Sequence, residues 1–352
     1  MLRFLARRIR YSLLVLWGVV TLVFFLFNVL PGDPARLTLG QRSDLSSLAN
    51  VRRDLNLDKP LFTRYFLYLN DLLPISMNAD DATSARKYGY LKLFNISKEN
   101  CLVLKWPYLG RSYRTKREVN AVISEALPGT IVLALAAMTL ATICGILLGM
   151  LAALKKGTWL DTTAITASVA GISLPSFFAA LLIAYFFGYL LHNITGLNMT
   201  GSLWEYDPFT GKHLVISNLI LPALALGIRP LAIITQLTRS SLLDVLNQDY
   251  IRTAYAKGLS KTQVLFRHAL PNAINPVITT VSGWLAELLA GSFFVEYIFG
   301  WKGVGKITVD ALDKFDFPLV MGSVLLTAFI FIIINLFTDI LYSVLDPRVR
   351  IH

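Results

Sequence analysis

Six long apolar runs constrain this sequence more than any other feature. A helix needs about 20 apolar residues to cross the roughly 30 Å hydrocarbon core of a bilayer. Charged residues make up only 16% of the 352 positions, against about 25% in a typical soluble domain. We therefore predict an all-α, polytopic membrane bundle with six transmembrane helices. The runs cover residues 11–30, 126–154, 162–192, 214–238, 269–298 and 317–338.

The basic residues predict the orientation of these helices, because short cytoplasmic loops are enriched in Lys and Arg. Four arginines precede the first run, and Lys155 and Lys156 follow the second. Placing both clusters in the cytoplasm puts both chain termini there. The third run decides this prediction. One tilted or kinked helix over residues 162–192 preserves the pattern, whereas two helices separated at Pro175 would invert everything that follows. We favour the single helix.

The predicted topology divides the chain into four segments. The stretch between the first two helices is too polar for lipid and is expected to form an external subdomain. Its middle, residues 76–105, mixes charged, amide and aromatic side chains without clear periodicity. The segments are residues 1–30 (N-terminus and first helix), 31–127 (external), 128–346 (five-helix core with a cytoplasmic loop at 240–272) and 347–352 (cytoplasmic tail).

The loop after the fourth run has the signals of a helix, a turn and a second helix. Lys257 suits the carboxyl end of the first helix, because its charge complements the helix dipole. Gly258 is a natural left-handed residue directly after that end. Ser260 and Gln263 have the spacing of a capping box, which predicts that a new helix begins at once.

The second helix of this loop is predicted to be short. Pro271 and then Pro276 limit it to about two turns and lead into the fifth run. Val264, Leu265 and His268 lie on adjacent turns and would present a face to another protein. Any long cytoplasmic loop forms helices, so this pattern alone does not establish docking.

Catalytic and metal-binding patterns are missing from the sequence. The four histidines fall in separate segments without ligand spacing. Residues 300–306 match a phosphate-binding loop except at its end, where Ile307 replaces the Ser or Thr that holds magnesium. We predict no catalytic residue, no metal site and no ATP site on this chain.

Arg229 and Glu287 are charged residues inside the fourth and fifth runs. Charge within a membrane is costly and often functional, which suggests positions along a translocation path. A structural ion pair, or an arginine that extends to the headgroups, explains them equally well. Both interpretations stay open.

The loop resembles the "EAA" loop of the membrane subunits of ATP-binding-cassette importers. Ala254, Gly258 four positions later and the pair Leu270-Pro271 carry the resemblance. In that family the short helix after the glycine is the coupling helix, which sits in a groove on the cytoplasmic ATPase subunit. The resemblance implies an ATPase-coupling loop that includes Arg252, Thr253, Ala254, Gly258, Ser260, Val264, Leu265, His268, Leu270 and Pro271.

Other motifs resemble the dipeptide, oligopeptide and nickel permeases within that family. Asn56, Gln236, Tyr255 and Lys302 depart from the usual residues, and residues 76–105 look longer than in most relatives, so the solute stays open. The matching stretches, in order, are Leu30-Pro31-Gly32-Asp33-Pro34, Leu55 to Pro60, Leu109-Gly110-Arg111-Ser112, Leu127-Pro128, Val295-Glu296, Gly303-Val304-Gly305, Asp316 with Pro318, Asn335-Leu336, and Asp346-Pro347-Arg348.

The resemblance implies the transmembrane domain of a type I importer in the bacterial inner (plasma) membrane. It implies import of di- or oligopeptides, or of a related small solute such as nickel. Its expected partners are a second homologous permease, two cytoplasmic ABC ATPases and an external solute-binding protein. No cofactor is expected on this chain, and ATP and Mg are expected on the ATPases.

Two other classes of protein compete with this interpretation. A self-sufficient secondary transporter or channel would show paired inverted repeats or broken helices rich in ionisable residues. A membrane enzyme would need His, Asp, Glu, Ser or Cys clustered near one interface. Neither pattern is evident in the sequence.

Overall fold

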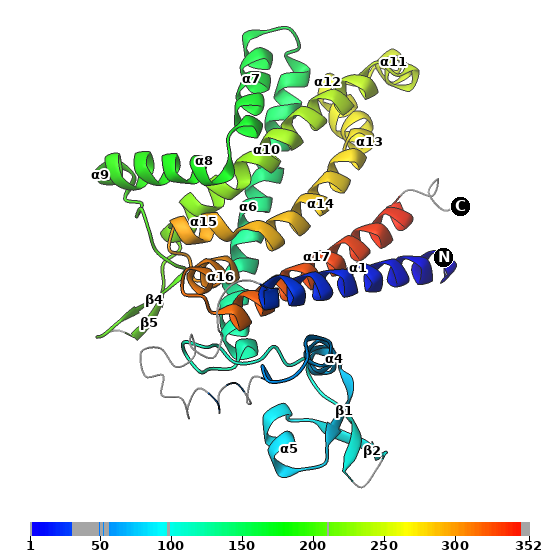
Figure 1. Cartoon of the computed structure of the whole chain (residues 1–352). Helices are drawn as coiled ribbons and strands as arrows, with labels where there is room; N and C mark the ends of the chain where they lie inside the picture. Colours follow the sequence, from blue (N-terminus) through cyan, green and yellow to red (C-terminus); the bar gives the residue numbers. More distant parts are fainter. Residues whose placement is uncertain are drawn as a thin grey trace. The chain divides into compact units, whose positions relative to one another are not determined.

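The computed structural model describes residues 2–29, 49, 52, 56–96, 99–209 and 211–345. The chain is predominantly helical and forms two compact units (Figure 1). The larger unit comprises Met1–Leu16, Ala126–Val309 and Leu326–His352, and the smaller unit comprises Trp17–Glu125 and Asp310–Leu325. The predicted motifs at residues 30–34 and 346–348 lie outside the described residues.

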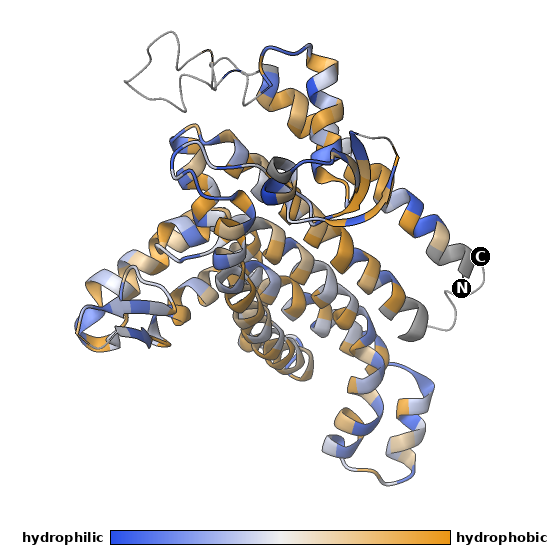
Figure 2. Cartoon of the chain, turned by 90° about the horizontal axis from the view of Figure 1, so that it is seen from below, coloured by the Kyte–Doolittle hydropathy of each residue, from blue (hydrophilic) through white to orange (hydrophobic). Residues whose placement is uncertain are grey.

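Within the described residues, four helices are long and apolar enough to cross a membrane. They are α1 (Leu2–Val29), α6 (Val119–Leu154), α10 (Ser217–Leu246) and α17 (Phe317–Leu345). Figure 2 shows that hydrophobic residues dominate most of their length. These helices correspond to the first, second, fourth and sixth predicted runs. Each of these runs forms one continuous helix, because no residue with an extended backbone interrupts it.

The third and fifth runs are each broken by a bend. The third forms α7 (Trp159–Ser173) and then α8 (Ser176–Ile183) with the π-helix η1 (Ala184–Leu190), at 110° to α7. Leu174 is extended, as expected for a residue that precedes a proline, and α8 leaves α7 at a sharp angle (Figure 1). The third run is therefore not one continuous helix. The count reaches six spans when each bent pair is one span.

The fifth run bends by 50° where α13 (Leu270–Ala273) meets α14 (Asn275–Gly291). Short elements complete the larger unit: α9 (His192–Thr195), the β4–β5 hairpin (Trp204–Asp207 and Gly211–Leu214), α15 (Phe293–Ile298) and the start of α16 (Val304–Asp313). Its core lies around α10, which packs against α7, α8 and α14.

The smaller unit contains a three-stranded antiparallel sheet in the order β1-β3-β2. Alternate residues of β3, Cys101 and Val103, are buried, which is the pattern of a strand with one covered face. Residues 76–105 thus fold into a small subdomain. Its elements are β1 (Ile75–Ala79), α5 (Ala82–Tyr88), β2 (Leu91–Asn95) and β3 (Asn100–Leu104), preceded by α4 (Leu61–Leu72).

Candidate functional site

The loop after α10 begins with α11 (Asp249–Ala256) and a glycine turn. Gly258 has φ +84°, the left-handed conformation predicted for it. The capping box is also confirmed. The backbone N–H of Gln263 donates to Ser260 Oγ at 3.3 Å, and the backbone N–H of Ser260 donates to Gln263 Oε1 at 3.1 Å. The reversal between the two helices is therefore built by local interactions.

The second helix of the loop is longer than predicted. It runs from Lys261 to Ala273 through α12 (Lys261–Val264), the π-helix η2 (Leu265–Ala269) and α13, which is more than three turns. Pro271 does not end it. The π-helical turn directly before Pro271 shifts the hydrogen-bond register, which is one way that a helix accommodates a proline. The prediction of about two turns is wrong for this reason.

The inner face of this helix is apolar and buried. Val264 is fully buried and Leu265 nearly so, in a cluster with Ile251 of α11, Met150 of α6 and Leu242 of α10. The prediction that Val264 and Leu265 face outward is wrong, because these side chains leave water by packing on the ends of α6 and α10. The loop is consequently joined to two long helices through its core.

The outer face of the same helix carries different residues. Phe266 is 53% exposed, and Lys261, Gln263 and Arg267 beside it are also exposed. His268 is half-buried. A large exposed aromatic ring flanked by basic side chains is typical of a surface that another protein covers. The sequence carried a signal for this face, since residues 266 and 267 directly follow the two apolar residues that the core requires.

The remaining predicted loop residues divide between the two faces. Ala254 is buried in the core cluster, whereas Arg252 is exposed and lies 3.5 Å from the carboxylate of Asp249. Thr253 Oγ1 donates to the backbone carbonyl of Asp249 at 3.1 Å, and Leu270 is half-buried while Pro271 is exposed.

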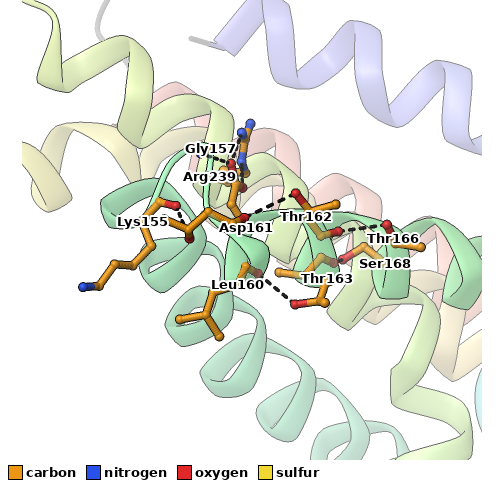
Figure 3. A network of polar contacts seen from close by, with 11 residues as sticks. Lys155, Gly157, Leu160, Asp161, Thr162, Thr163, Thr166, Ser168 and Arg239 are labelled. Carbon is orange, nitrogen blue, oxygen red and sulfur yellow. Dashed lines mark hydrogen bonds and ion pairs between the residues drawn. The ribbon is translucent and has the colours of Figure 1, made fainter.

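An ion pair that the sequence interpretation missed joins α7 to α10 near this loop (Figure 3). Arg239 donates from Nε to Asp161 Oδ1 at 2.5 Å and from Nη2 to Asp161 Oδ2 at 2.8 Å. The backbone N–H of Gly157 donates to the same carboxylate at 3.0 Å. Asp161 is buried, so the pair fixes the start of α7 to α10 one turn before Leu242 of the loop core. The sequence signal for this pair was that Asp161 directly precedes the third apolar run and Arg239 directly follows the fourth.

Arg229 and Glu287 do not form an ion pair in the part of the chain that the structure describes. Arg229 is half-buried, and its guanidinium lies 5.9 Å from the ring centre of Trp284 on α14. Its Nε is buried without a hydrogen-bond partner among the described residues. Glu287 is on the exposed face of α14. Their assignment to a translocation path stays a prediction.

The glycine-rich turn at residues 300–306 is occupied by a side chain of the protein itself. The buried carboxylate of Glu296 accepts hydrogen bonds from the backbone N–H groups of Gly305 at 2.7 Å and Lys306 at 3.2 Å, and from the hydroxyl of Ser292 at 2.7 Å. A β-carbon on Gly303 would lie 2.3 Å from Glu296 Oε2. The glycines therefore leave space for this carboxylate. It accepts hydrogen bonds from the backbone N–H groups that would bind the ligand in a phosphate-binding loop.

Metal-binding residues do not gather in the described ranges, which contain no group of three or more His, Cys, Asp and Glu side chains that could hold an ion.

Two family models match the sequence and together cover most of the chain. The model described as the binding-protein-dependent transport system inner membrane component matches residues 145–351. The model for the N-terminal part of such membrane components matches residues 1–134.

Relatives match the chain from end to end. A di/tripeptide transport system permease protein of Pseudomonas aeruginosa is 36% identical, and a dipeptide transport system permease protein of Escherichia coli is 34% identical, each with 99% of both chains covered. A glutathione transport system permease protein of Salmonella choleraesuis is 34% identical with the same coverage. The chain belongs to the family of binding-protein-dependent transport system inner membrane components, which are permease subunits of ABC importers.

Proposed function

We propose that this chain is one of two membrane-spanning subunits of an ATP-driven importer of di- or oligopeptides. The observation that carries the proposal is its similarity, over 99% of its length, to permeases named for di/tripeptides, dipeptides and glutathione. Glutathione is itself a tripeptide, so all three names share one solute class. The partners in this proposal are a second permease subunit, two cytoplasmic ATPases that bind ATP and Mg²⁺, and an external solute-binding protein.

The loop at residues 240–272 is the proposed link to an ATPase. Its exposed face, with Phe266 and Arg267, supplies a contact surface, and its buried face, with Val264 and Leu265, packs on α6 and α10. Movement of an ATPase would therefore reach two long helices through a packed core rather than through a flexible connection. In this proposal the loop and both chain termini lie in the cytoplasm.

The proposal excludes a self-sufficient transporter, which would place ionisable residues at its broken helices. The two breaks found among the described helices lie at Leu174–Pro175 and at Ile274, and none of these residues is ionisable. The chain itself carries out no covalent chemistry in this scheme.

Uptake into vesicles tests the proposal. The full complex, reconstituted with its binding protein, is expected to accumulate a labelled dipeptide only with ATP inside the ATPase compartment. Unlabelled dipeptide should compete, and nickel should not. Dipeptide uptake by this chain and its partner permease without the ATPases would overturn the proposal. Competition by nickel but not by unlabelled dipeptide would show that the transported solute is nickel and not a peptide.

A further inference from the structure

Helix α4 lies against the carboxyl-terminal part of α1, within the smaller unit. The hydroxyl groups of Tyr65 and Thr21 are 2.6 Å apart, and the Tyr65 ring packs on Phe24 with the ring centres 5.2 Å apart. The span within α1 ends at Asn28. Thr21 is seven residues earlier, or about 10 Å at 1.5 Å per residue. Helix α4 therefore contacts α1 about two turns before the end of its apolar stretch.

The other face of α4 is apolar and uncovered by the described residues. Phe62 is 70% exposed and Phe66, one turn later, is 65% exposed, and Leu73 at the helix end is exposed as well. Apolar rings on one face of a short helix beside a span are typical of helices that lie in the interfacial layer of a bilayer. The contact of α4 with the apolar stretch of α1 favours lipid as the occupant of this face.

A cavity of about 760 Å³ lies next to α4, and all of its lining residues belong to the smaller unit. One wall is apolar and comes from the two spans, with Phe24 and Phe27 of α1 and Phe317, Met321 and Leu325 of α17. The volume is in the range of small-molecule sites. An apolar wall made by membrane-spanning helices suits an acyl chain better than a water-soluble solute.

Basic side chains form another part of the cavity lining. They include Arg64, Arg86, Lys87 and Arg111, against the single carboxylate of Asp71. Asp71 is already engaged, because it accepts from the hydroxyl of Tyr88 at 2.9 Å and lies 3.8 Å from Lys105 Nζ. Arg111 lies 3.5 Å from the carboxylate of Glu118, so the excess positive charge of the cavity comes from Arg64, Arg86 and Lys87.

Arg64 is one of the cations that line the cavity. It donates to the amide oxygen of Asn28, and in the described part of the chain no carboxylate lies within ion-pair distance of it. Burial lowers the pKa of the Arg64 guanidinium. Lys87 Nζ lies over the rings of Tyr88 and Tyr108, 4.6 and 5.1 Å from their centres. Guanidinium groups match the geometry of phosphate oxygens, and an ammonium adds a point charge.

We propose that this cavity binds the phosphate group of an anionic phospholipid, with Arg64 and Lys87 at the headgroup and an acyl chain along α1 and α17. Helix α4 lies in the same headgroup layer and closes one side of the site. The site is separate from solute transport, so it does not depend on the proposed peptide substrate.

Native mass spectrometry of the purified complex tests the site, with phosphatidylglycerol as the probe. Wild-type complex is expected to retain one phosphatidylglycerol per chain after detergent washing and to prefer it to phosphatidylcholine. Arg64→Gln and Lys87→Gln should each weaken retention about tenfold, the factor for one lost charge-assisted hydrogen bond. Arg64→Lys keeps the positive charge and should retain more phosphatidylglycerol than Arg64→Gln. This difference would show that the weaker lipid retention of Arg64→Gln is not caused by misfolding. Lys92→Gln is the control, because Lys92 pairs with Asp80 outside the cavity.

Competition identifies the source of the phosphate. Millimolar inorganic phosphate and a dipeptide should leave lipid retention unchanged. Displacement by phosphate would overturn the lipid in favour of the free ion, and displacement by the dipeptide would turn the cavity into a solute site. Equal retention in wild type and Arg64→Gln would overturn the site altogether.

The position of α4 has its own measurement. Phe62→Trp is expected to add tryptophan fluorescence that phospholipids with brominated acyl chains quench, relative to the parent chain. An added signal that these lipids do not quench would show that a protein covers this face, and would overturn the interfacial position of α4.

Discussion

Asp316 accepts a hydrogen bond from the backbone N–H of Tyr113 at 2.9 Å, although the two residues are 203 positions apart. The same buried carboxylate also accepts from the hydroxyl of Ser112. The bonds join the segment before α6 to the residue before α17, both within the smaller unit. One carboxylate thus fixes the approach to two membrane-spanning helices.

Replacement of Asp316 is expected to destabilise the smaller unit. Asp316→Ala leaves the buried hydroxyl of Ser112 and the part-buried N–H of Tyr113 without this acceptor, at about 2–4 kcal/mol. Asp316→Asn keeps one acceptor oxygen and should cost about half as much. Thermal unfolding of the purified complex, followed for each variant, measures the order. Equal melting temperatures for Asp316→Ala and wild type would contradict the role given to this carboxylate.

Tyr113 gives a prediction for alkaline pH. Burial, and next the charge of Asp316, raise the pKa of its phenol to about 12. Because the pKa of Tyr113 is higher in the folded state, the neutral phenol contributes its full stabilisation of the fold below the pKa of the unfolded chain, about 10. This stabilisation is lost as the pH rises from about 10 to 12, by about 2 kcal/mol in all. Wild type should therefore lose more thermal stability than Tyr113→Phe across this window. Parallel pH profiles for the two proteins would show that Tyr113 ionises without cost.

Glu296 predicts a contrast between two substitutions. Glu296→Gln retains an oxygen that can accept from the N–H groups of Gly305 and Lys306, so it should cost about 1 kcal/mol or less. Glu296→Ala leaves the buried N–H of Gly305 and the buried hydroxyl of Ser292 without this acceptor and should cost about 3 kcal/mol or more. Gly303→Ala should resemble Glu296→Ala, because its β-carbon would meet the carboxylate. Expression level and melting temperature of the three variants rank them, and a tolerated Gly303→Ala would argue against the close packing.

The two faces of the loop helix predict two different defects. Val264→Ala removes buried methyl groups and should lower stability by about 2 kcal/mol. Phe266→Ala changes an exposed side chain, so stability should stay within about 0.5 kcal/mol, while ATPase binding and solute-stimulated hydrolysis fall. Tyr206→Ala, another exposed aromatic in the larger unit, is the control for Phe266. Normal coupling in Phe266→Ala would place the ATPase contact elsewhere.

Local features of the fold were predictable from the sequence, and features that depend on distant residues were not. Gly258 and the Ser260–Gln263 capping box are set by neighbours in the chain, and both are confirmed. The inward direction of Val264 depends on Met150 of α6, more than 100 positions away. The Asp161–Arg239 pair likewise joins two helices whose packing no local pattern specifies.

The bends show the same limit. Pro175 marked a break in the third run, but proline allows either a kink or a stop. The 110° angle follows from the packing of α7 and α8 on α10, which composition does not report. Long apolar runs therefore predicted where the apolar helices lie but not how they bend.

Gly258 separates backbone geometry from bulk. Its φ is +84°, and a β-carbon there would meet nothing within 4 Å. A side chain at this position is therefore strained only by its backbone conformation, at about 1–2 kcal/mol. Asn tolerates the left-handed region better than Val, so Gly258→Asn should be milder than Gly258→Val. Because the strain lies between α11 and the second loop helix, it should reorient that helix while α6 and α10 stay folded.

The expected defect of Gly258→Val is consequently in coupling. The variant should insert in the membrane and assemble with its partner permease, yet bind the ATPases weakly or lose solute-stimulated hydrolysis. Gly258→Ala serves as the matched control for a side chain of minimal size, and it should lie between Asn and Val because its β-carbon carries the same strain without branching. ATPase activity of reconstituted complexes, measured with and without loaded binding protein, gives the ranking. Wild-type stimulation in Gly258→Val would show that the angle between the two loop helices has no part in coupling.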